Sequence, residues 1–284
     1  MSKDLMTRRA AVGLLGVAIA PRVRGQAVSP GILRAIRVDH VALDVGDLDK
    51  ELSFYRRLFG NEVLKNKTTP RRYLRLGPCY LAIAPVASGQ TPGINHFAIA
   101  IENFNAAGMK TALQGAGIPV REQDAGLFVT DPDGNSIQLG ADQSWKLLSN
   151  AAPENYPKEP SLFQPTGMHH MAIQVSDTAK AVAFYSKLFG KPIDDPPGTP
   201  QPLFLAGDTR LRIYPPAPNK PPRIDHFSAL VERFDAAAAL RTVKSLGAKA
   251  ELSKDGALNE FFDPEGIRMQ VTMPGQTFGA PAKK

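Results

Sequence analysis

The sequence predicts an α+β protein built from two copies of one domain. Residues 39–45 (DHVALDV) return as residues 169–175 (HHMAIQV), 130 residues later. Residues 54–60 (FYRRLFG) return at the same shift as residues 184–190 (FYSKLFG). The length of 284 residues also suits two domains of roughly 100 to 200 residues, each with its own core. Strand-like and helix-like segments alternate within both copies, which indicates the α+β class.

Each copy is expected to begin with a strand, a helix and further short strands. Residues 38–45 alternate between large aliphatic side chains and smaller or polar ones, the pattern of a half-buried strand. Apolar residues recur at helical spacing over residues 48–59, and Gly60 stands where a helix C-cap glycine is common. The apolar runs 73–76 and 80–84 are predicted strands.

The second half of the copy is predicted to repeat this order, so that each domain contains two similar modules. The expected elements are a strand at 95–101, a helix at 104–116 ended by Gly117, and strands near 119–122, 126–130 and 136–140.

The repeats place the domains at residues 35–141 and 167–273. Residues 142–166 are rich in Pro, Asn and Ser and are predicted to be a linker, and residues 274–284 a polar tail.

Residues 1–27 resemble a twin-arginine export signal. Arg8 and Arg9 precede the apolar run 10–20, and residues 25–27 (GQA) offer small side chains for cleavage. The run is shorter than the roughly 20 residues needed to cross a bilayer. We therefore expect a periplasmic or otherwise exported protein, with no integral membrane span after signal cleavage.

Charge and cysteine content exclude some classes of function. The net charge is +7, but part of it lies in residues 1–27, and no basic run is interleaved with aromatic residues. Nucleic acid is therefore not an expected partner. The single Cys79 cannot form an intramolecular disulfide. A small-molecule substrate is expected, and the sequence leaves open whether two chains form a homodimer.

Four of the five histidines form two pairs at the same spacing, His40 with His96 and His170 with His226. Imidazole is the commonest protein ligand for catalytic divalent metals. A lone histidine in a strand is usually a buried structural residue, but an equal pair in both copies favours metal ligands. Strand alternation predicts that His169 faces away from His170 and is not a ligand.

The repeated segments resemble the vicinal oxygen chelate superfamily, which includes glyoxalase I, extradiol dioxygenases and bleomycin-resistance proteins. The resemblance rests on residues 39–43, 54–60, 95–98 and 131–138 and their second-domain counterparts. It implies tandem domains of paired βαβββ modules, each pair forming a cup-shaped mixed sheet. In the family, a divalent metal at the floor of the cup is chelated by two neighbouring oxygens of the substrate.

The resemblance implies metal ligands at His40 and His96, and at His170 and His226. The family's third ligand, a glutamate on the last strand, falls on Gln138 and Gln270. An amide oxygen is a weaker donor than a carboxylate and cannot act as a base, so lower metal affinity is expected. The missing carboxylate disfavours proton transfer of the glyoxalase type. It also disfavours, less strongly, extradiol and other iron oxygenases, which the resemblance implies use two histidines and one carboxylate. The resemblance implies Fe, Mn, Ni or Zn as the divalent ion, without choosing among them.

Other polar residues of the cups complete the predicted sites. Candidates for a replacement catalytic group are Tyr73, Glu122 and Glu260. Candidates for binding an anionic or phenolic substrate are Arg71, Arg72, Arg212 and Tyr214.

Two classes of function fit these residues. The first is a divalent-metal-dependent lyase, isomerase or dioxygenase that acts on a small molecule with vicinal oxygens, in one domain or both. The second is a non-catalytic protein that binds or sequesters a small molecule, as resistance proteins of this superfamily do.

Overall fold

The computed structural model describes residues 31–123, 126–142, 144–157, 159–194, 201–254 and 256–275. The predicted export signal and residues 276–284 of the predicted tail lie outside these ranges. Within them, no helix has both the length and the apolar character needed to cross a membrane.

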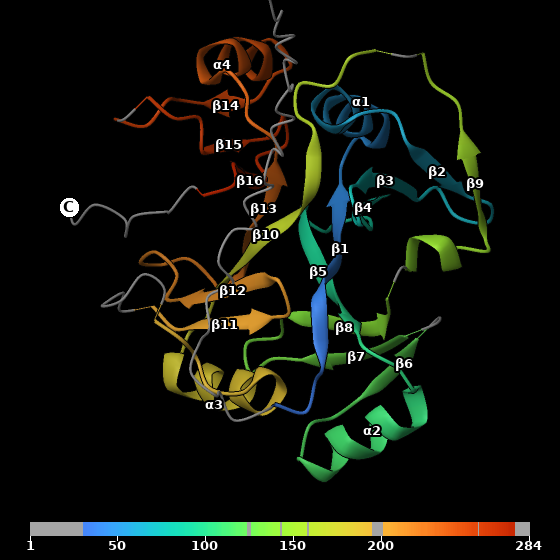
Figure 1. Ribbon diagram of the computed structural model, residues 1–284, viewed down its shortest axis with the longest axis vertical. Helices are drawn as coiled ribbons and strands as arrows, with labels where there is room; N and C mark the ends of the chain where they lie inside the picture. The colour runs from blue at the N-terminus through green and yellow to red at the C-terminus, as the bar shows by residue number, and fades with distance from the viewer. Residues whose placement is uncertain are drawn as a thin grey trace, which may run out of the picture.

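Two mixed β-sheets and four α-helices make up the described chain, which confirms the predicted α+β fold of two repeated domains (Figure 1). The first sheet has the strand order β6-β7-β8-β5-β1-β4-β3-β2-β9. Its strands are β1 (Ala35–Val45), β2 (Val63–Asn66), β3 (Arg72–Leu76), β4 (Cys79–Pro85), β5 (Gly93–Ile101), β6 (Arg121–Gln123), β7 (Gly126–Thr130), β8 (Ser136–Ala141) and β9 (Ala151–Glu154).

The second sheet repeats this plan in the order β11-β12-β10-β13-β16-β15-β14. Its strands are β10 (Pro165–Gln174), β11 (Leu203–Ala206), β12 (Thr209–Tyr214), β13 (Arg223–Val231), β14 (Lys249–Ala250), β15 (Glu260–Phe262) and β16 (Arg268–Thr272). In both sheets the first strands of the two modules pair antiparallel at the centre, and each pairs in parallel with the last strand of its own module.

Each helix begins at an Asp or Asn whose side chain accepts a hydrogen bond from a backbone N–H three residues later, which satisfies one of the free donors of the first turn. The helices are α1 (Leu48–Phe59), α2 (Ala106–Gly115), α3 (Thr178–Phe189) and α4 (Ala236–Ser245). The predicted helix 48–59 is confirmed. The predicted helix 104–116 is two residues shorter at its start because Asn105 caps it.

The segment predicted to be a linker packs along the first domain. It contains a short 3-10 helix, Ser144–Leu147, and strand β9, which pairs antiparallel with β2. Neither β2 nor β9 was predicted, because four-residue strands carry too little alternation to stand out. The first sheet therefore has two more strands than the second.

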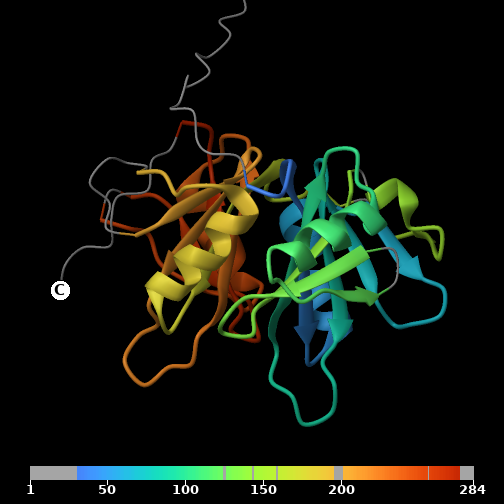
Figure 2. The same ribbon diagram turned by 90° about the horizontal axis from the view of Figure 1, so that it is seen from below.

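The two domains hold each other through reciprocal contacts of their equivalent residues. The Tyr55 hydroxyl donates to Asp263 Oδ2 at 2.8 Å, and the Tyr185 hydroxyl donates to Asp131 Oδ2 at 3.0 Å. Both tyrosines are fully buried. The repeated Asp-Pro-X-Gly turns thus join the domains, and one hydrophobic core runs through both. Figure 2 shows the two domains side by side.

The segments that precede strands β1 and β10 also make reciprocal contacts, each with a helix of the other domain. The N–H groups of Ile32 and Leu33 donate to the last turn of α3, at Lys187 O and Leu188 O. Residues 162 and 163 donate to the last turn of α1 in the same manner. Each domain therefore binds otherwise unpaired helix-end carbonyls of the other.

Glu51 breaks this symmetry at the domain interface. It is fully buried in α1, whereas the equivalent position in α3 is Ala181. No described group meets the geometry of a hydrogen bond to either Glu51 oxygen. Burial, together with the negative charge of Asp263, raises the pKa of Glu51 to about 9. The carboxyl is therefore neutral in the folded protein at pH 7.

The free energy of unfolding should fall as pH rises from 4.5 towards about 9. Over this range the unfolded chain ionises Glu51 while the folded chain keeps it protonated, which costs at most about 1.4 kcal/mol per pH unit for one carboxyl. In Glu51→Gln the decline should be shallower, as measured by urea denaturation across the range. Asp49→Asn, an exposed change on the same helix, is the control. A Glu51→Gln profile parallel to that of the wild type would contradict this account.

Candidate metal centre and substrate cavity

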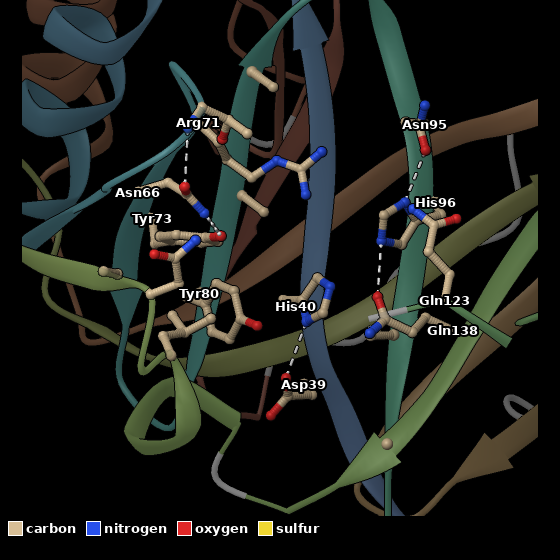
Figure 3. Close-up of a pocket in the computed structure, with 18 of the residues that line it drawn as sticks. Asp39, His40, Asn66, Arg71, Tyr73, Tyr80, Asn95, His96, Gln123 and Gln138 are labelled. Atoms are coloured by element: carbon tan, nitrogen blue, oxygen red, sulfur yellow. Dashed lines mark hydrogen bonds and ion pairs between the residues drawn. The ribbon is translucent and has the colours of Figure 1, made fainter. Parts of the chain in front are cut away.

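The floor of the first cup brings together His40, His96 and Gln138. In the β1–β5 pair, His40 lies opposite Ala98 and His96 lies opposite Ala42, so the two imidazoles are diagonal neighbours with ring centroids 5.5 Å apart. In the parallel β5–β8 pair, Gln138 lies beside Ala98. The three side chains that the sequence singled out in this domain therefore meet on one face of the sheet (Figure 3).

Irregular register beside the histidines places a second polar side chain next to each ring. The β1–β5 register shifts between Val38 and His40, so Asp39 does not alternate to the far face. Asp39 Oδ2 lies 3.0 Å from His40 Nδ1. The β10–β13 register shifts in the same way between residues 168 and 170. The expectation that His169 faces away from His170 is therefore wrong: their Nδ1 atoms are 2.8 Å apart.

The partners of His96 fix the position of its proton. Asn95 donates from Nδ2 to the Asp44 carboxylate at 2.7 Å, so its Oδ1, 2.8 Å from His96 Nδ1, is an acceptor. Burial, reinforced by the positive field of His40 and Arg71, lowers the pKa of His96 to about 3, so the ring carries a single N–H. With that proton on Nδ1, the Nε2 lone pair points at Gln138 Oε1, 3.1 Å away.

The His40 ring is held in the same way, with Nδ1 facing an oxygen of the preceding residue. Its Nδ1 donates to the Asp39 carboxylate at 3.0 Å, which leaves Nε2 as the ring nitrogen towards the cavity. Outer hydrogen bonds of this kind set the tautomer of metal-binding histidines. Two imidazole Nε2 atoms and one amide oxygen thus face one small volume. His96 Nε2 and Gln138 Oε1 lie close enough for one cation to bind both.

A cavity of ≈ 920 Å³ opens above these three side chains. It exists because small residues, among them Ala82, Ala84, Ala98 and Ser136, line the central strands. Its walls include aromatic rings: Tyr80 stacks on His40 with centroids 4.6 Å apart, and Phe128 meets His96 edge-on at 5.3 Å. A side chain at Gly126 would place its Cβ 2.9 Å from Gln138 Nε2, so this glycine makes room for the amide.

The second cup has the same strand register but larger polar side chains. Arg212, Tyr214 and Arg268 stand at the positions of Ala82, Ala84 and Ser136. The Arg268 guanidinium donates to Asp225 and Glu260, and the Tyr214 hydroxyl donates to Asp225. These larger, mutually bonded side chains stand where the first domain has alanine and serine.

The histidines of the second cup bind one another in a chain. His169 Nδ1 contacts His170 Nδ1 at 2.8 Å, His170 Nε2 contacts His226 Nε2 at 3.1 Å, and His226 Nδ1 contacts Asp225 Oδ2 at 2.7 Å. Burial lowers the pKa of both His170 and His226, so these rings are neutral. In the order His169 to His170 to His226 to Asp225, every contact pairs one N–H with one acceptor. No lone pair of this chain is left facing another acceptor.

The other predicted site residues divide between cavity and surface. Tyr73 and Arg71 line the cavity, and the Tyr73 hydroxyl accepts a hydrogen bond from Asn66 Nδ2 at 3.1 Å. Arg72 points away and pairs with Glu154. Glu122 also points away and pairs with Lys110, because its strand neighbours Arg121 and Gln123 are the residues that face the cavity.

The second-domain candidates are occupied in contacts of their own. Glu260 binds Arg268 and accepts from Gln270 Nε2 at 3.3 Å, while Arg212 lies 3.5 Å from Gln201.

The sequence interpretation missed several cavity residues. They are Asp39, Tyr80, Asn95, Arg121, Gln123 and Phe128. Alternation along β4 and β6 could have indicated Tyr80, Arg121 and Gln123. Asp39 and Asn95 depend on the register shifts, which alternation does not predict.

The described residues contain no cluster of three or more His, Cys, Asp or Glu side chains suited to a metal ion. The third donor of the first cup is an amide, which explains this result. The family model described as the glyoxalase/bleomycin resistance protein/dioxygenase superfamily matches residues 37–139 and 167–271. The chain belongs to this superfamily. It contains two tandem domains of the family.

Known relatives include two kinds of enzyme. The chain is 26% identical over 186 residues to catechol-2,3-dioxygenase of Bacillus subtilis (strain 168), covering 54% of this chain and 64% of that protein. A second relative is a lactoylglutathione lyase of Arabidopsis thaliana. The match spans less than two thirds of the length of each of these curated relatives.

Solved structures share the fold of both domains. The 2,3-dioxygenase LapB from Pseudomonas sp. KL28 superposes with a TM-score of 0.62 at 17% identity, covering 89% of this chain and 97% of that one. A Mn(II)-bound glyoxalase from Novosphingobium aromaticivorans gives 0.62 at 15% identity, covering 86% and 84%.

Gln138→Glu should bind a divalent ion roughly tenfold or more tightly than the wild type, because a carboxylate adds charge and a stronger donor beside two histidine lone pairs. Titration of metal-stripped protein with Mn²⁺ in a calorimeter measures this. Gln270→Glu is the matched control, for which no gain is expected because Arg268 and the histidine chain occupy that cup. Equal gains in both variants would contradict the difference between the cups.

Proposed function

We propose that the protein is a divalent-metal-dependent enzyme acting on a small molecule with two adjacent oxygens, with its one metal site in the first domain. The observation that carries the proposal is the convergence of His40, His96 and Gln138 on the cavity floor, where His96 Nε2 and Gln138 Oε1 lie 3.1 Å apart. His40, whose Nδ1 binds Asp39, presents Nε2 to the same floor. A cation satisfies all three donors at once.

The donor set fits such an ion, with reduced affinity. Two imidazoles and one amide are neutral, so they do not offset the ion's charge as a carboxylate would. A bound ion would supply Lewis-acid polarisation of the substrate oxygens and a place for dioxygen to bind. Incomplete charge neutralisation favours a substrate that binds as an anion. His40, His96 and Gln138 would hold the ion, while Asp39 and Asn95 keep both rings oriented.

The second cup does not fit a divalent ion. Binding there would require breaking the hydrogen bond between His170 and His226, and the Arg268 guanidinium would repel the ion. We propose that this domain supports the first through the reciprocal Tyr–Asp contacts and has no metal of its own.

Oxygenation is the reaction that the cavity suits best. Isomerisation of the glyoxalase type needs a carboxylate to move a proton, and Asp39, engaged with His40, is the only carboxylate among the described cavity residues. Ring opening of a dihydroxylated aromatic by dioxygen places both oxygen atoms in the product and needs no external reductant. The likeness to a catechol-2,3-dioxygenase supports this choice.

Aromatic side chains of this chain would orient such a substrate. Tyr80 and Phe128 flank the two histidines and offer flat apolar walls that exclude water. Tyr73 accepts from Asn66 and so keeps its own O–H for donation into the cavity, where a substrate oxygen would receive it.

Metal analysis tests the proposal directly. The purified wild-type protein should contain one divalent ion per chain, His40→Ala should lose it, and His170→Ala should keep it, as measured by inductively coupled plasma mass spectrometry. Oxygen uptake is then measured with catechol-type substrates on the metal-loaded protein. If the wild type holds no more divalent metal than the double variant that carries His40→Ala and His170→Ala, the metal-dependent function is excluded.

Non-catalytic binding is the second candidate function. The observation in its favour is that the floor carries Gln138 where the family has a glutamate. Metal-loaded protein that binds a dihydroxylated aromatic without oxygen uptake or any change in the bound molecule would favour this candidate over the enzyme.

We also propose that the chain is exported through the twin-arginine route, on the basis of Arg8, Arg9 and the short apolar run that follows. Fractionation should find the processed protein outside the cytoplasm. Substitution of both arginines by lysine should retain the unprocessed chain inside. Equal export of wild type and variant would exclude this route.

A further inference from the structure

The cavity of the first domain carries more positive charge than a neutral substrate requires. Arg71 and Arg121 line it, and Asp39 is the only carboxylate among its described lining residues. Asp39 is buried against His40. Two guanidinium groups against one carboxylate leave the cavity with a net positive charge.

Neither arginine has a carboxylate partner among the described residues. Arg121 contacts the Gln123 amide and lies over the Phe128 ring, with Cζ 4.5 Å from the centroid. By contrast, the neighbouring Arg72 pairs with Glu154 and faces away from the cavity. An arginine without an acid beside a concave site commonly binds a carboxylate or phosphate of a ligand.

The two arginines stand on opposite walls. Arg71 immediately precedes β3, and Arg121 begins β6, while the floor strands β1 and β5 lie between them in the sheet. Both arginines line the same cavity as His96. Figure 3 shows Arg71 extending over the sheet from the side of Asn66 and Tyr73 towards the histidines.

The size and walls of the cavity define the rest of the ligand. Its ≈ 920 Å³ exceeds what a single dihydroxylated ring needs, so there is room for a substituent that carries charge. The rings of Tyr73, Tyr80 and Phe128 favour a flat body between the arginines and the floor.

We propose that the natural ligand of this cavity is a small planar carboxylic acid, and that Arg71 and Arg121 bind its carboxylate. The inference names the substrate class of the function proposed above and rests on that function only for the two adjacent oxygens at the floor. Arg71 and Arg121 are then the residues that determine specificity for charged over neutral molecules.

The experiment compares two probes of the same shape, 3,4-dihydroxybenzoate and its neutral amide, on metal-free wild-type protein by calorimetry. We expect the acid to bind roughly tenfold more tightly than the amide for each arginine engaged. The preference should shrink as salt is added, because part of it is long-range attraction. Trp145 is the only tryptophan of the chain, and its ring centroid lies 5.6 Å from that of the cavity residue Tyr80. Its fluorescence therefore reports whether the probe enters this cup.

Variants assign the effect to the two residues. Arg71→Gln and Arg121→Gln should each reduce the preference, and the double variant should bind acid and amide within about twofold of each other. Arg241→Gln, which removes the same charge from an exposed position on α4, should leave it unchanged. Arg71→Lys and Arg121→Lys preserve the charge if the glutamine variants fold poorly, and they should retain part of the preference.

The outcomes separate this inference from the proposed function. Equal affinity for acid and amide in the wild type, or a preference that survives in the double variant, would overturn it even if the protein binds metal. A preference that depends on both arginines would uphold it even if no metal binds, in which case the metal-dependent function alone would fail.

Discussion

The antiparallel pairing of the two central strands is the constraint on which each cup depends. Because β1 and β5 lie side by side with shifted register, His40 and His96 become diagonal neighbours, and the residue before each histidine turns to the same face. β10 and β13 repeat this geometry. The backbone thus supplies two histidines and two outer partners in both domains. Whether those four groups direct lone pairs outwards or bind one another is decided by the side chains alone.

The two domains show how a duplicated backbone can take different roles. The acid beside the first histidine is Asp39 in one domain, and His169 stands at that position in the other. This difference, together with Asp225 in place of Asn95, lets the histidines of the second cup pair internally. Larger residues such as Arg268 stand where the first domain has Ser136. The second cup thus pairs its polar groups internally, whereas the first keeps an open cavity above its histidines.

Much of the fold follows from the sequence, because repeats, helix caps and strand alternation are local patterns. The helix at 48–59 and the meeting of His40, His96 and Gln138 depend only on those patterns and the family resemblance. The position of His169 could not be predicted, since a one-residue shift in register reverses the face of a side chain. Glu51 would be assigned to the surface from its charge, and its burial depends on how the domains pack.

Strand β9 forms one border of the first sheet. It covers the edge of β2, and its own central residue, Pro153, has no N–H to offer to a further strand. The opposite edge, β6, is only three residues long and exposed, with Arg121 and Glu122 among them. Both borders of the nine-stranded sheet therefore resist the addition of strands from other chains. The segment between the domains acts as a safeguard against aggregation, in addition to connecting them.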